Sequence, residues 1–219
     1  MKVVLFDIDD TLLDFHACAL WSMQEVAKDF NLVFPNNPLD IFLPINEALW
    51  KEIEAGSLDL EGLRQIRWKK VLKAMDIDFD GLVFEDAFRK KLAQASVQVK
   101  DAKKVVSLLS QKYTLGVASN GPYHQQRHRL KKAGLIDFFD YFFISENVGY
   151  SKPDPRFFQH VEKEVKTQDI CIIGDSLTAD MTPAKHRGWT TIWFTREEMN
   201  ENPMADYTIS TLDKVCTIL

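Results

Sequence analysis

The sequence predicts an α/β protein with a Rossmann-like open parallel sheet, a three-layer α/β/α core and an all-helical insert after the first strand. An apolar strand pattern stands close to the N-terminus, and from residue 100 onward strand patterns alternate with helix patterns. Between them, residues 15–94 contain helix patterns and no convincing strand. Because alternating strands and helices indicate parallel strands joined by right-handed crossovers, the first strand is expected to join the later sheet.

The first strand pattern ends in a cluster of carboxylates. Residues 3–6 are Val-Val-Leu-Phe, a run without alternation that is typical of a strand buried on both faces. Asp7, Asp9 and Asp10 follow within four residues, so the strand must end there and open onto a cleft. In an extended backbone Asp7 and Asp9 point the same way, and such a pair needs a cation or a shared proton. The alternative is an ordinary turn or helix cap.

The insert is predicted from helical periodicity. Apolar residues recur at helical spacing over residues 16–30, 45–53, 60–75 and 84–95, with prolines and glycines between these stretches. We therefore expect residues 1–14 and 95–219 to form the α/β core and residues 15–94 to form the helical insert.

Polar clusters follow three of the four strands predicted in the second half. These strands cover residues 113–119, 141–145, 170–174 and 190–194, with helices over 102–112, 122–134, 155–165 and 179–188. In an open parallel sheet, ligands bind outside the carboxyl ends of the strands. The clusters that fall there are Ser119-Asn120-Gly121, Ser151-Lys152-Pro153-Asp154 and Gly174-Asp175-Ser176.

These clusters fit phosphoryl chemistry. Asp7, Asp9 and Asp175 offer the hard oxygen ligands that Mg²⁺ uses. Lys152 supplies a compact positive charge that balances a carboxylate and a phosphate, which lowers the repulsion between an anionic nucleophile and an anionic substrate. Ser119 and backbone N–H groups are suited to phosphate oxygens.

The glycine-containing turn after residue 119 predicts the phosphate subsite. The backbone N–H groups of Asn120 and Gly121 can hold phosphate oxygens, and the glycine permits close approach. The sequence contains no GxxxxGK[ST] loop, so an ATP-binding P-loop is not expected.

Composition restricts the partners. A net charge of −5 argues against a binder of nucleic-acid polymers, and no run approaches the ~18 apolar residues of a membrane-spanning helix. There is no signal-peptide pattern, and the three cysteines suggest neither a disulfide framework nor a zinc site. We therefore expect a cytoplasmic protein that acts on a small-molecule phosphate ester and binds no membrane.

The four clusters together resemble a known family. Asp7-Ile8-Asp9-Asp10-Thr11-Leu12, Ser119-Asn120, Lys152-Pro153 and Gly174-Asp175 followed by Asp180 are similar to the four motifs of the haloacid dehalogenase superfamily. The order of the motifs and the position of the helical insert match as well.

This resemblance implies roles for the acidic residues. It implies that Asp7 forms an aspartyl-phosphate and that Asp9 first protonates the leaving oxygen and then takes a proton from water. It also implies Mg²⁺ bound by Asp7, the backbone carbonyl of Asp9 and Asp175, with Asp180 orienting the ligands or Lys152. The dehalogenases of the superfamily lack an acid at the position of Asp9, so its presence favours a phosphatase.

A narrower resemblance suggests a substrate class. Residues 45–50, 119–121 and 145–154 are similar to the bacterial pyrimidine 5′-nucleotidases of the superfamily, which implies a nucleoside monophosphate substrate and a cap that recognises the leaving group. Possible substrate contacts are Phe15, Trp21, Asn46 and Trp50, although for the three aromatic residues the interior of the insert is the interpretation we favour.

Other functions and sites remain open at this stage. A phosphosugar phosphatase or a β-phosphoglucomutase-like mutase would use the same core, and a receiver-like signalling module also uses an acidic pocket with a Lys-Pro pair. His124 and His128 lie four residues apart in a basic run over residues 124–132. With Gln126 and Arg129 around them, we interpret this run as a solvated helix face rather than a metal or nucleic-acid site.

Overall fold

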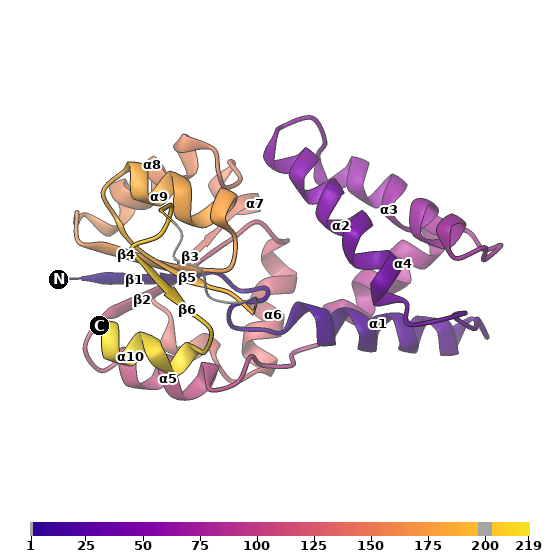
Figure 1. The fold of residues 1–219 in the computed structure, drawn as a ribbon, viewed down its shortest axis with the longest axis horizontal. Helices are drawn as coiled ribbons and strands as arrows, with labels where there is room; N and C mark the ends of the chain where they lie inside the picture. Colours follow the sequence, from indigo (N-terminus) through magenta and orange to yellow (C-terminus); the bar gives the residue numbers. More distant parts are fainter. Residues whose placement is uncertain (1, 197–202) are drawn as a thin grey trace. The chain divides into compact units, whose positions relative to one another are not determined.

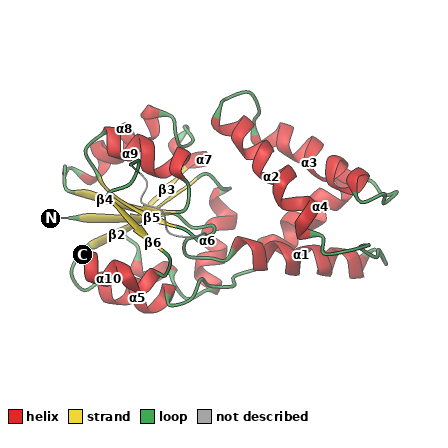
Figure 2. Cartoon of the chain, in the orientation of Figure 1, coloured by secondary structure: helices red, strands yellow, loops and turns green. Residues whose placement is uncertain are grey.

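The computed structural model describes residues 2–196 and 203–219. It divides into two compact units, residues 1–15 with 96–219 and residues 16–95 (Figure 2). The sequence placed the corresponding boundaries at 14/15 and 94/95, and the assignment of these segments as catalytic core and cap stays a prediction.

The α-helices are α1 (Phe15–Asp29), α2 (Leu39–Glu54), α3 (Leu60–Ala74), α4 (Gly81–Leu92), α5 (Ala102–Leu109), α6 (Tyr123–Lys132), α7 (Ser145–Val148), α8 (Pro155–Val165), α9 (Thr182–His186) and α10 (Val215–Ile218). Short 3₁₀ or π turns are η1 (Ile136–Phe138), η2 (Leu177–Met181) and η3 (Leu212–Lys214).

The larger unit contains a six-stranded parallel sheet in the order β3-β2-β1-β4-β5-β6 (Figure 1). The chain builds one half of the sheet outward from β1 through β2 and β3, then returns to add β4, β5 and β6 on the other side of β1. The strands are β1 (Val3–Phe6), β2 (Thr114–Ser119), β3 (Tyr141–Ile144), β4 (Ile170–Gly174), β5 (Thr190–Phe194) and β6 (Tyr207–Ile209). The predicted α/β class and parallel sheet are confirmed, and β6 is a strand that the sequence did not predict.

Two apolar cores lie on the two faces of this sheet. On one face α5, α10 and Leu130 of α6 pack against the strands, and on the other α8 and α9 do so. Figure 1 shows α5 and α10 below the sheet and α8 and α9 above it. The strand β1 is buried along its whole length because it has a neighbour on both sides and helices on both faces. This explains why its sequence is a continuous apolar run.

The smaller unit is all-helical in its described residues, which confirms the predicted helical insert. At its centre Trp68 packs against Phe42, with ring centroids 5.4 Å apart, and against Phe88 at 5.1 Å. The buried Arg67 donates two hydrogen bonds to Glu85, at 2.6 and 3.0 Å. A buried ion pair is tolerated only when both charged groups are hydrogen-bonded, and the two bonds from the guanidinium to the two carboxylate oxygens meet this need.

Local sequence signals fix several helix starts. Asp154 caps α8 by accepting the N–H of Arg156 at 2.8 Å, and Pro155 occupies the first turn, where its missing N–H costs nothing. Asp80 caps α4 by accepting two backbone N–H groups. Within the described residues, none of the helices has the length and apolar character needed to cross a membrane.

Candidate active site

The predicted site residues of the core gather at the carboxyl ends of β1, β2 and β4. Asp7 follows β1, and its N–H donates to Ile173 O of β4 at 2.8 Å. Because the chain order reverses at β1, the loops after β1 and its neighbours diverge and leave room for a ligand. Ser119 ends β2, and Asp175 follows β4. The sheet topology therefore brings together residues that are more than a hundred positions apart in the sequence.

Lys152 is the buried cation of this site. Its Nζ donates to Asp7 Oδ1 at 2.8 Å, to Asp180 Oδ1 at 2.5 Å and to Ala118 O at 2.7 Å. Its exposed fraction is 2%, so the ammonium has exchanged water for these three acceptors. Burial alone would lower the pKa of Lys152, but the charges of Asp180 and Asp7 outweigh burial and raise it above its usual value. Lys152 is therefore a fixed positive charge beside Asp7.

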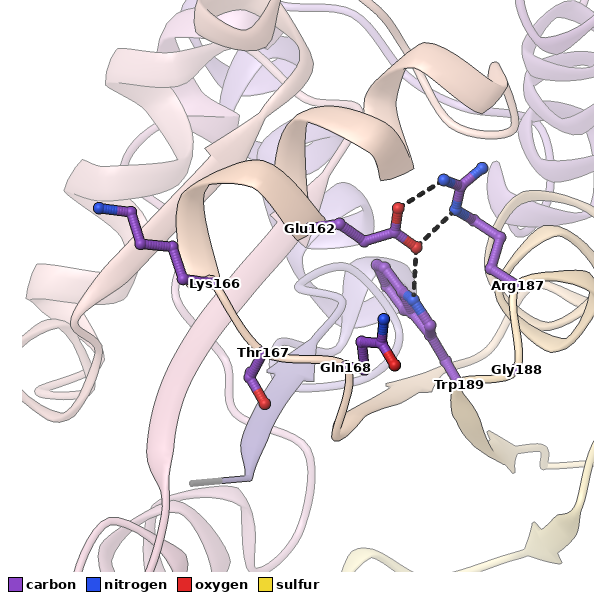
Figure 3. Close-up of a pocket in the computed structure, with 7 residues that line it drawn as sticks. All are labelled: Glu162, Lys166, Thr167, Gln168, Arg187, Gly188 and Trp189. Carbon is purple, nitrogen blue, oxygen red and sulfur yellow. Dashed lines mark hydrogen bonds and ion pairs between the residues drawn. The ribbon is translucent and has the colours of Figure 1, made fainter.

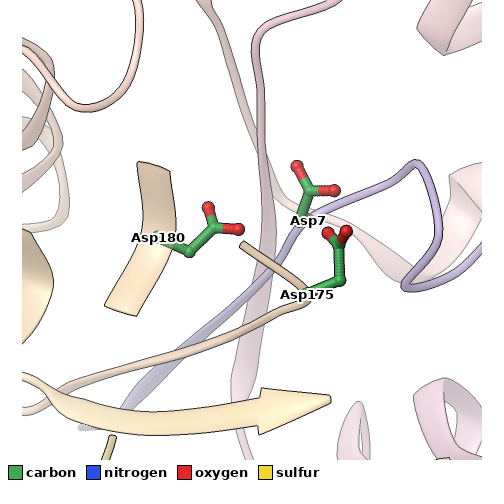
Figure 4. Close-up of side chains that lie close together, drawn as sticks. All are labelled: Asp7, Asp175 and Asp180. Atoms are coloured by element: carbon green, nitrogen blue, oxygen red, sulfur yellow. The ribbon is translucent and has the colours of Figure 1, made fainter. Parts of the chain in front are cut away.

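Three carboxylates stand close together around this lysine. One oxygen from each of Asp7, Asp175 and Asp180 lies within 4.8 Å of the others (Figure 4). Figure 4 shows Asp7 and Asp175 pointing to the same side, with Asp180 facing them from a separate segment. In the described residues this is the one group of three or more acidic, histidine or cysteine side chains with the spacing of a metal site. Asp9 contributes no carboxylate oxygen to it.

Burial and the repulsion between neighbouring carboxylates raise the pKa of two of these acids. Desolvation raises the pKa of Asp7 to about 7; Lys152 opposes this rise and the charge of Asp180 adds to it. The pKa of Asp175 is also raised well above its usual value, by desolvation and by the charges of Asp7 and Asp180. Because Asp175 is exposed to solvent, the repulsion is the cause that the geometry supports best. The single ammonium of Lys152 does not neutralise three carboxylates, and a divalent cation would complete the balance.

Glycine and tryptophan residues shape the acidic cluster. A Cβ added to Gly174 would lie 2.4 Å from Asp180 Oδ2, so glycine leaves the space that this carboxylate occupies. The indole N–H of Trp193 on β5 donates to Asp175 O at 2.8 Å and thereby holds the backbone of the loop after β4. The sequence alone does not predict this contact, because it depends on the pairing of β4 with β5.

Asn120 links two of the predicted motifs through its side chain. Its Nδ2 donates to Lys152 O and its Oδ1 accepts the N–H of Lys152, both at 2.8 Å. The sequence predicts only a backbone role for Asn120 in phosphate binding, whereas in the structure its side-chain amide fixes the segment that carries Lys152. The N–H of Gly121 donates to Ser119 Oγ at 3.2 Å, which keeps that hydroxyl at the end of β2.

Asp9 is held by α6, which the sequence analysis did not expect. Its Oδ1 accepts from Arg129 Nη1 at 2.6 Å and its Oδ2 from Gln126 Nε2 at 2.8 Å. Both donors have an exposed fraction of 0%, so the interpretation of the whole run 124–132 as a solvated helix face was wrong for these two residues. They share the buried face of α6 with Leu130, which packs into the core. Their spacing of three residues, which places both side chains on one face of a helix, was the sequence signal that could have predicted this pairing.

His124 and His128 lie on the exposed side of α6, as the interpretation of a solvated face requires. Neither belongs to the cluster of residues with metal-site spacing in the described part of the chain. The same helix therefore has one solvated face and one buried polar face.

The four residues predicted as possible substrate contacts in the insert have different surroundings. Asn46 is buried and its Oδ1 accepts from Arg67 Nη1 at 2.9 Å, so within its own unit it serves the buried ion pair. Trp50 is partly buried and packs against the apolar cluster of Leu49, Ile53 and Leu63. Trp21 is 39% exposed, and Phe15, at the start of α1, is half-buried. Their role as substrate contacts stays a prediction.

A second hollow lies at the opposite edge of the sheet. It is lined by residues at the end of α8 and at the start of β5 (Figure 3), namely Glu162, Lys166, Thr167, Gln168, Arg187, Gly188 and Trp189. Glu162 accepts hydrogen bonds from Arg187 Nε at 2.8 Å and from Trp189 Nε1 at 3.1 Å. Its negative charge is therefore balanced by Arg187 within the protein. Because these residues precede β4 and β5, the hollow is separate from the carboxylate cluster that follows the strands.

The chain is similar to known proteins over most of its length. A family model described as haloacid dehalogenase-like hydrolase matches residues 1–188. The crystal structure of the HAD-hydrolase YfnB from Bacillus subtilis, bound to magnesium, superposes with a TM-score of 0.91 at 30% identity and covers 100% of this chain and 98% of that one.

Two enzymes with named substrates are also similar to the chain. The pyrimidine 5′-nucleotidase PynA of Streptococcus pneumoniae is 30% identical, over 94% of this chain and 89% of that protein. The glyceraldehyde 3-phosphate phosphatase of Pyrococcus furiosus is 26% identical, over 100% of this chain and 93% of that protein.

Proposed function

Because the chain belongs to the haloacid dehalogenase-like hydrolases, we propose that it hydrolyses phosphate monoesters with Asp7 as the covalent nucleophile. The observation that carries this proposal is the pairing of the buried Asp7 with Lys152 beside Asp175 and Asp180. A carboxylate attacks a phosphate dianion only where positive charge reduces the repulsion between them. Lys152 provides one such charge at 2.8 Å from Asp7.

The proposed reaction has two displacements at phosphorus. In the first, a carboxylate oxygen of Asp7 bonds to phosphorus, the bond from phosphorus to the ester oxygen breaks, and that oxygen takes a proton from Asp9. In the second, water bonds to phosphorus and gives a proton to Asp9, while the bond between Asp7 and phosphorus breaks. The sum is one ester and one water converted to one alcohol and one inorganic phosphate.

The acidic cluster fits Mg²⁺. Carboxylate oxygens are the ligands that this ion prefers, and one oxygen from each of Asp7, Asp175 and Asp180 lies within 4.8 Å of the others, with a single lysine ammonium beside them. We propose that Asp7, Asp175 and the backbone carbonyl of Asp9 hold the ion, while Asp180 orients Lys152. When bound, Mg²⁺ supplies positive charge at the phosphate oxygens.

The remaining site residues bind and orient the phosphate. Ser119, with the backbone N–H groups of Asn120 and Gly121, is the proposed phosphate subsite, and the side chain of Asn120 keeps Lys152 in place. Asp9 distinguishes the proposed reaction from dehalogenation, because a halide leaving group needs no proton. The acid at this position is therefore an argument for a phosphate ester with an alcohol leaving group.

The favoured substrate is a pyrimidine nucleoside 5′-monophosphate. This choice is supported by the likeness to PynA and by the similarity of residues 45–50 and 145–154 to that branch of the family. The second candidate is a small phosphosugar, supported by the likeness to the phosphatase of Pyrococcus furiosus. Rates on the two classes of ester, compared as kcat/KM, distinguish these candidates.

The test is release of inorganic phosphate from a panel of nucleotides, sugar phosphates and p-nitrophenyl phosphate, with Mg²⁺ or with EDTA. We expect Mg²⁺-dependent turnover and its loss in Asp7→Asn, because an amide does not attack phosphorus. Glu164→Gln, an exposed carboxylate on α8, is the matched control and should keep wild-type rates. Absence of turnover on every ester would overturn the proposed function. Near-normal turnover by Asp7→Asn would overturn the covalent mechanism.

A further inference from the structure

A buried polar network on α6 connects Asp9 to Ser119. Arg129 Nη1 donates to Asp9 Oδ1 at 2.6 Å and to Gln126 Oε1 at 3.0 Å. Gln126 Nε2 donates to Asp9 Oδ2 at 2.8 Å and to Ser119 Oγ at 2.9 Å. The network therefore contacts the proposed proton carrier and the proposed phosphate subsite with one pair of side chains.

The network has one consistent arrangement of donors and acceptors. An arginine only donates, so Gln126 must turn its oxygen toward Arg129 and its NH₂ group toward Asp9 and Ser119. A flipped amide would place two donors against each other and an oxygen against the Asp9 carboxylate. The orientation of Gln126 is thus fixed by Arg129, and that of Asp9 is fixed by both.

Two features allow this network to be buried: the absence of a side chain at Gly121 and the charge of Asp9 beside Arg129. A Cβ on Gly121 would lie 2.4 Å from Gln126 Nε2, so only glycine at this position lets the amide reach Asp9. A guanidinium with 0% exposure is unfavourable unless a charged partner compensates it, and the Asp9 carboxylate at 2.6 Å is such a partner. Neither Gln126 nor Arg129 is exposed to a substrate, which excludes direct contact as their role.

We propose that Gln126 and Arg129 are positioning residues, which hold the Asp9 carboxylate in the orientation for proton transfer. The inference rests on the proposed function, in which Asp9 gives a proton to the leaving oxygen and takes one from water. An ionised carboxylate has about four acceptor sites, so two hydrogen bonds leave others for the substrate side. Asp9 remains 33% exposed, which keeps those sites accessible.

The consequence is a dependence on the leaving group. Proton donation matters for an alkyl phosphate, whose alkoxide leaves poorly, and matters little for p-nitrophenyl phosphate, whose phenolate leaves without a proton. If Asp9 is misplaced, kcat/KM for the alkyl ester falls, while kcat/KM for the aryl ester is nearly unchanged. A variant that merely loosens the fold would lower both values together.

The experiment compares Gln126→Leu and Arg129→Met with the wild-type protein on p-nitrophenyl phosphate and on the alkyl phosphate that the wild-type protein hydrolyses fastest. We expect kcat/KM for the alkyl ester to fall about 10–100-fold, part of the 10²–10⁴ that acid–base catalysis provides, and the aryl ester to lose less than about threefold. Arg129→Lys should recover part of the loss. Gln125→Leu and Arg127→Met, neighbours on α6 without contact to Asp9, are the matched controls.

A double-mutant cycle with Asp9→Asn makes the test specific. If the two residues act through Asp9, adding Arg129→Met or Gln126→Leu to Asp9→Asn should change kcat/KM by less than about twofold. Equal losses on the two esters, or full additivity with Asp9→Asn, would overturn the inference while wild-type turnover leaves the proposed function standing. Should Arg129→Met not fold, Gln126→Leu and Arg129→Lys carry the test. Lack of wild-type turnover on all esters would instead remove the proposed function, and the inference with it.

Discussion

Replacing Lys152 by methionine will lower the stability of the metal-free protein, and the loss will grow as pH rises. The lysine is 2% exposed and donates to two buried carboxylates, Asp7 and Asp180, and to one carbonyl. Removing one partner of a buried ion pair costs about 3–5 kcal/mol, because the remaining charge stays desolvated. For a chain of this size that corresponds to a decrease in Tm of roughly 6–20 °C.

The pH dependence follows from the carboxylates that remain. The pKa of Asp7 is already raised to about 7 with the lysine present, so the folded protein binds more protons than the unfolded chain between pH 4 and 7, and stability falls as pH rises through that window. Without the lysine the pKa of Asp7 rises further, and the window extends above pH 7. The difference between variant and wild type should then increase by up to about 1.4 kcal/mol per pH unit there.

The assay is denaturant unfolding with EDTA at pH 6, 7, 8 and 9. Lys163→Met, which removes an exposed lysine of α8, serves as the control and should match the wild type at every pH. The reasoning fails if the stability gap of Lys152→Met is the same at pH 6 and pH 9, or if it matches that of the control. Saturating Mg²⁺ should recover part of the loss, because the ion replaces the missing positive charge.

Three further predictions follow from contacts in the two units. Glu85→Met should destabilise the helical unit by about 3 kcal/mol in urea unfolding, because the guanidinium of Arg67 remains buried without its carboxylate; wild-type stability would contradict the importance of that pair. Trp193→Phe should weaken Mg²⁺ binding about tenfold by calorimetry, since the backbone of Asp175 loses its indole donor; an unchanged Kd would show that this contact does not position the ligand. Mg²⁺ at about 100 times its Kd should stabilise the wild type by about 2.7 kcal/mol at pH 8. At pH 6 the same concentration should stabilise it less, because protons compete with the ion for Asp7. Equal stabilisation at both pH values would argue against Asp7 as a ligand.

Different elements of the core carry the proposed substrate-contacting residues and the proposed positioning residues. In the proposed reaction, loops after β1, β2 and β4 supply the nucleophile, the phosphate subsite and a metal ligand, whereas the buried face of α6 contributes Gln126 and Arg129, which act through Asp9. If that proposal holds, a substitution on the buried face of α6 changes catalysis without changing any residue that touches the substrate. Stability and activity measurements on the same variants separate these two effects.

Some differences between sequence and structure have a common cause. The strand β6 is three residues long and pairs only with β5, so its short pattern gave no periodic signal. The four-residue helix α7 directly follows β3, in a segment for which the sequence predicts no helix. Both elements are too short to show a periodic pattern and are stabilised by packing against their neighbours, which cannot be read from a few residues.

The sequence alone determined the class of the fold and the residues at the centre of the candidate site. A continuous apolar run that ends in Asp7 requires a strand end at a cleft, and the parallel sheet places Ser119 and Asp175 at the same edge. These inferences depend only on backbone periodicity and on the direction of the strands. Periodicity is visible in a few consecutive residues, and the alternation of strands with helices along the chain sets the direction of the strands.

Only the tertiary structure decided which partner each polar side chain has. Asp9 and Arg129 are 120 residues apart, and their contact depends on how α6 is rotated against the sheet. The same holds for the amide of Asn120 on the backbone of Lys152. Hydrogen bonds need atoms placed within a few tenths of an ångström, and the packing of whole elements sets such positions, while sequence spacing does not.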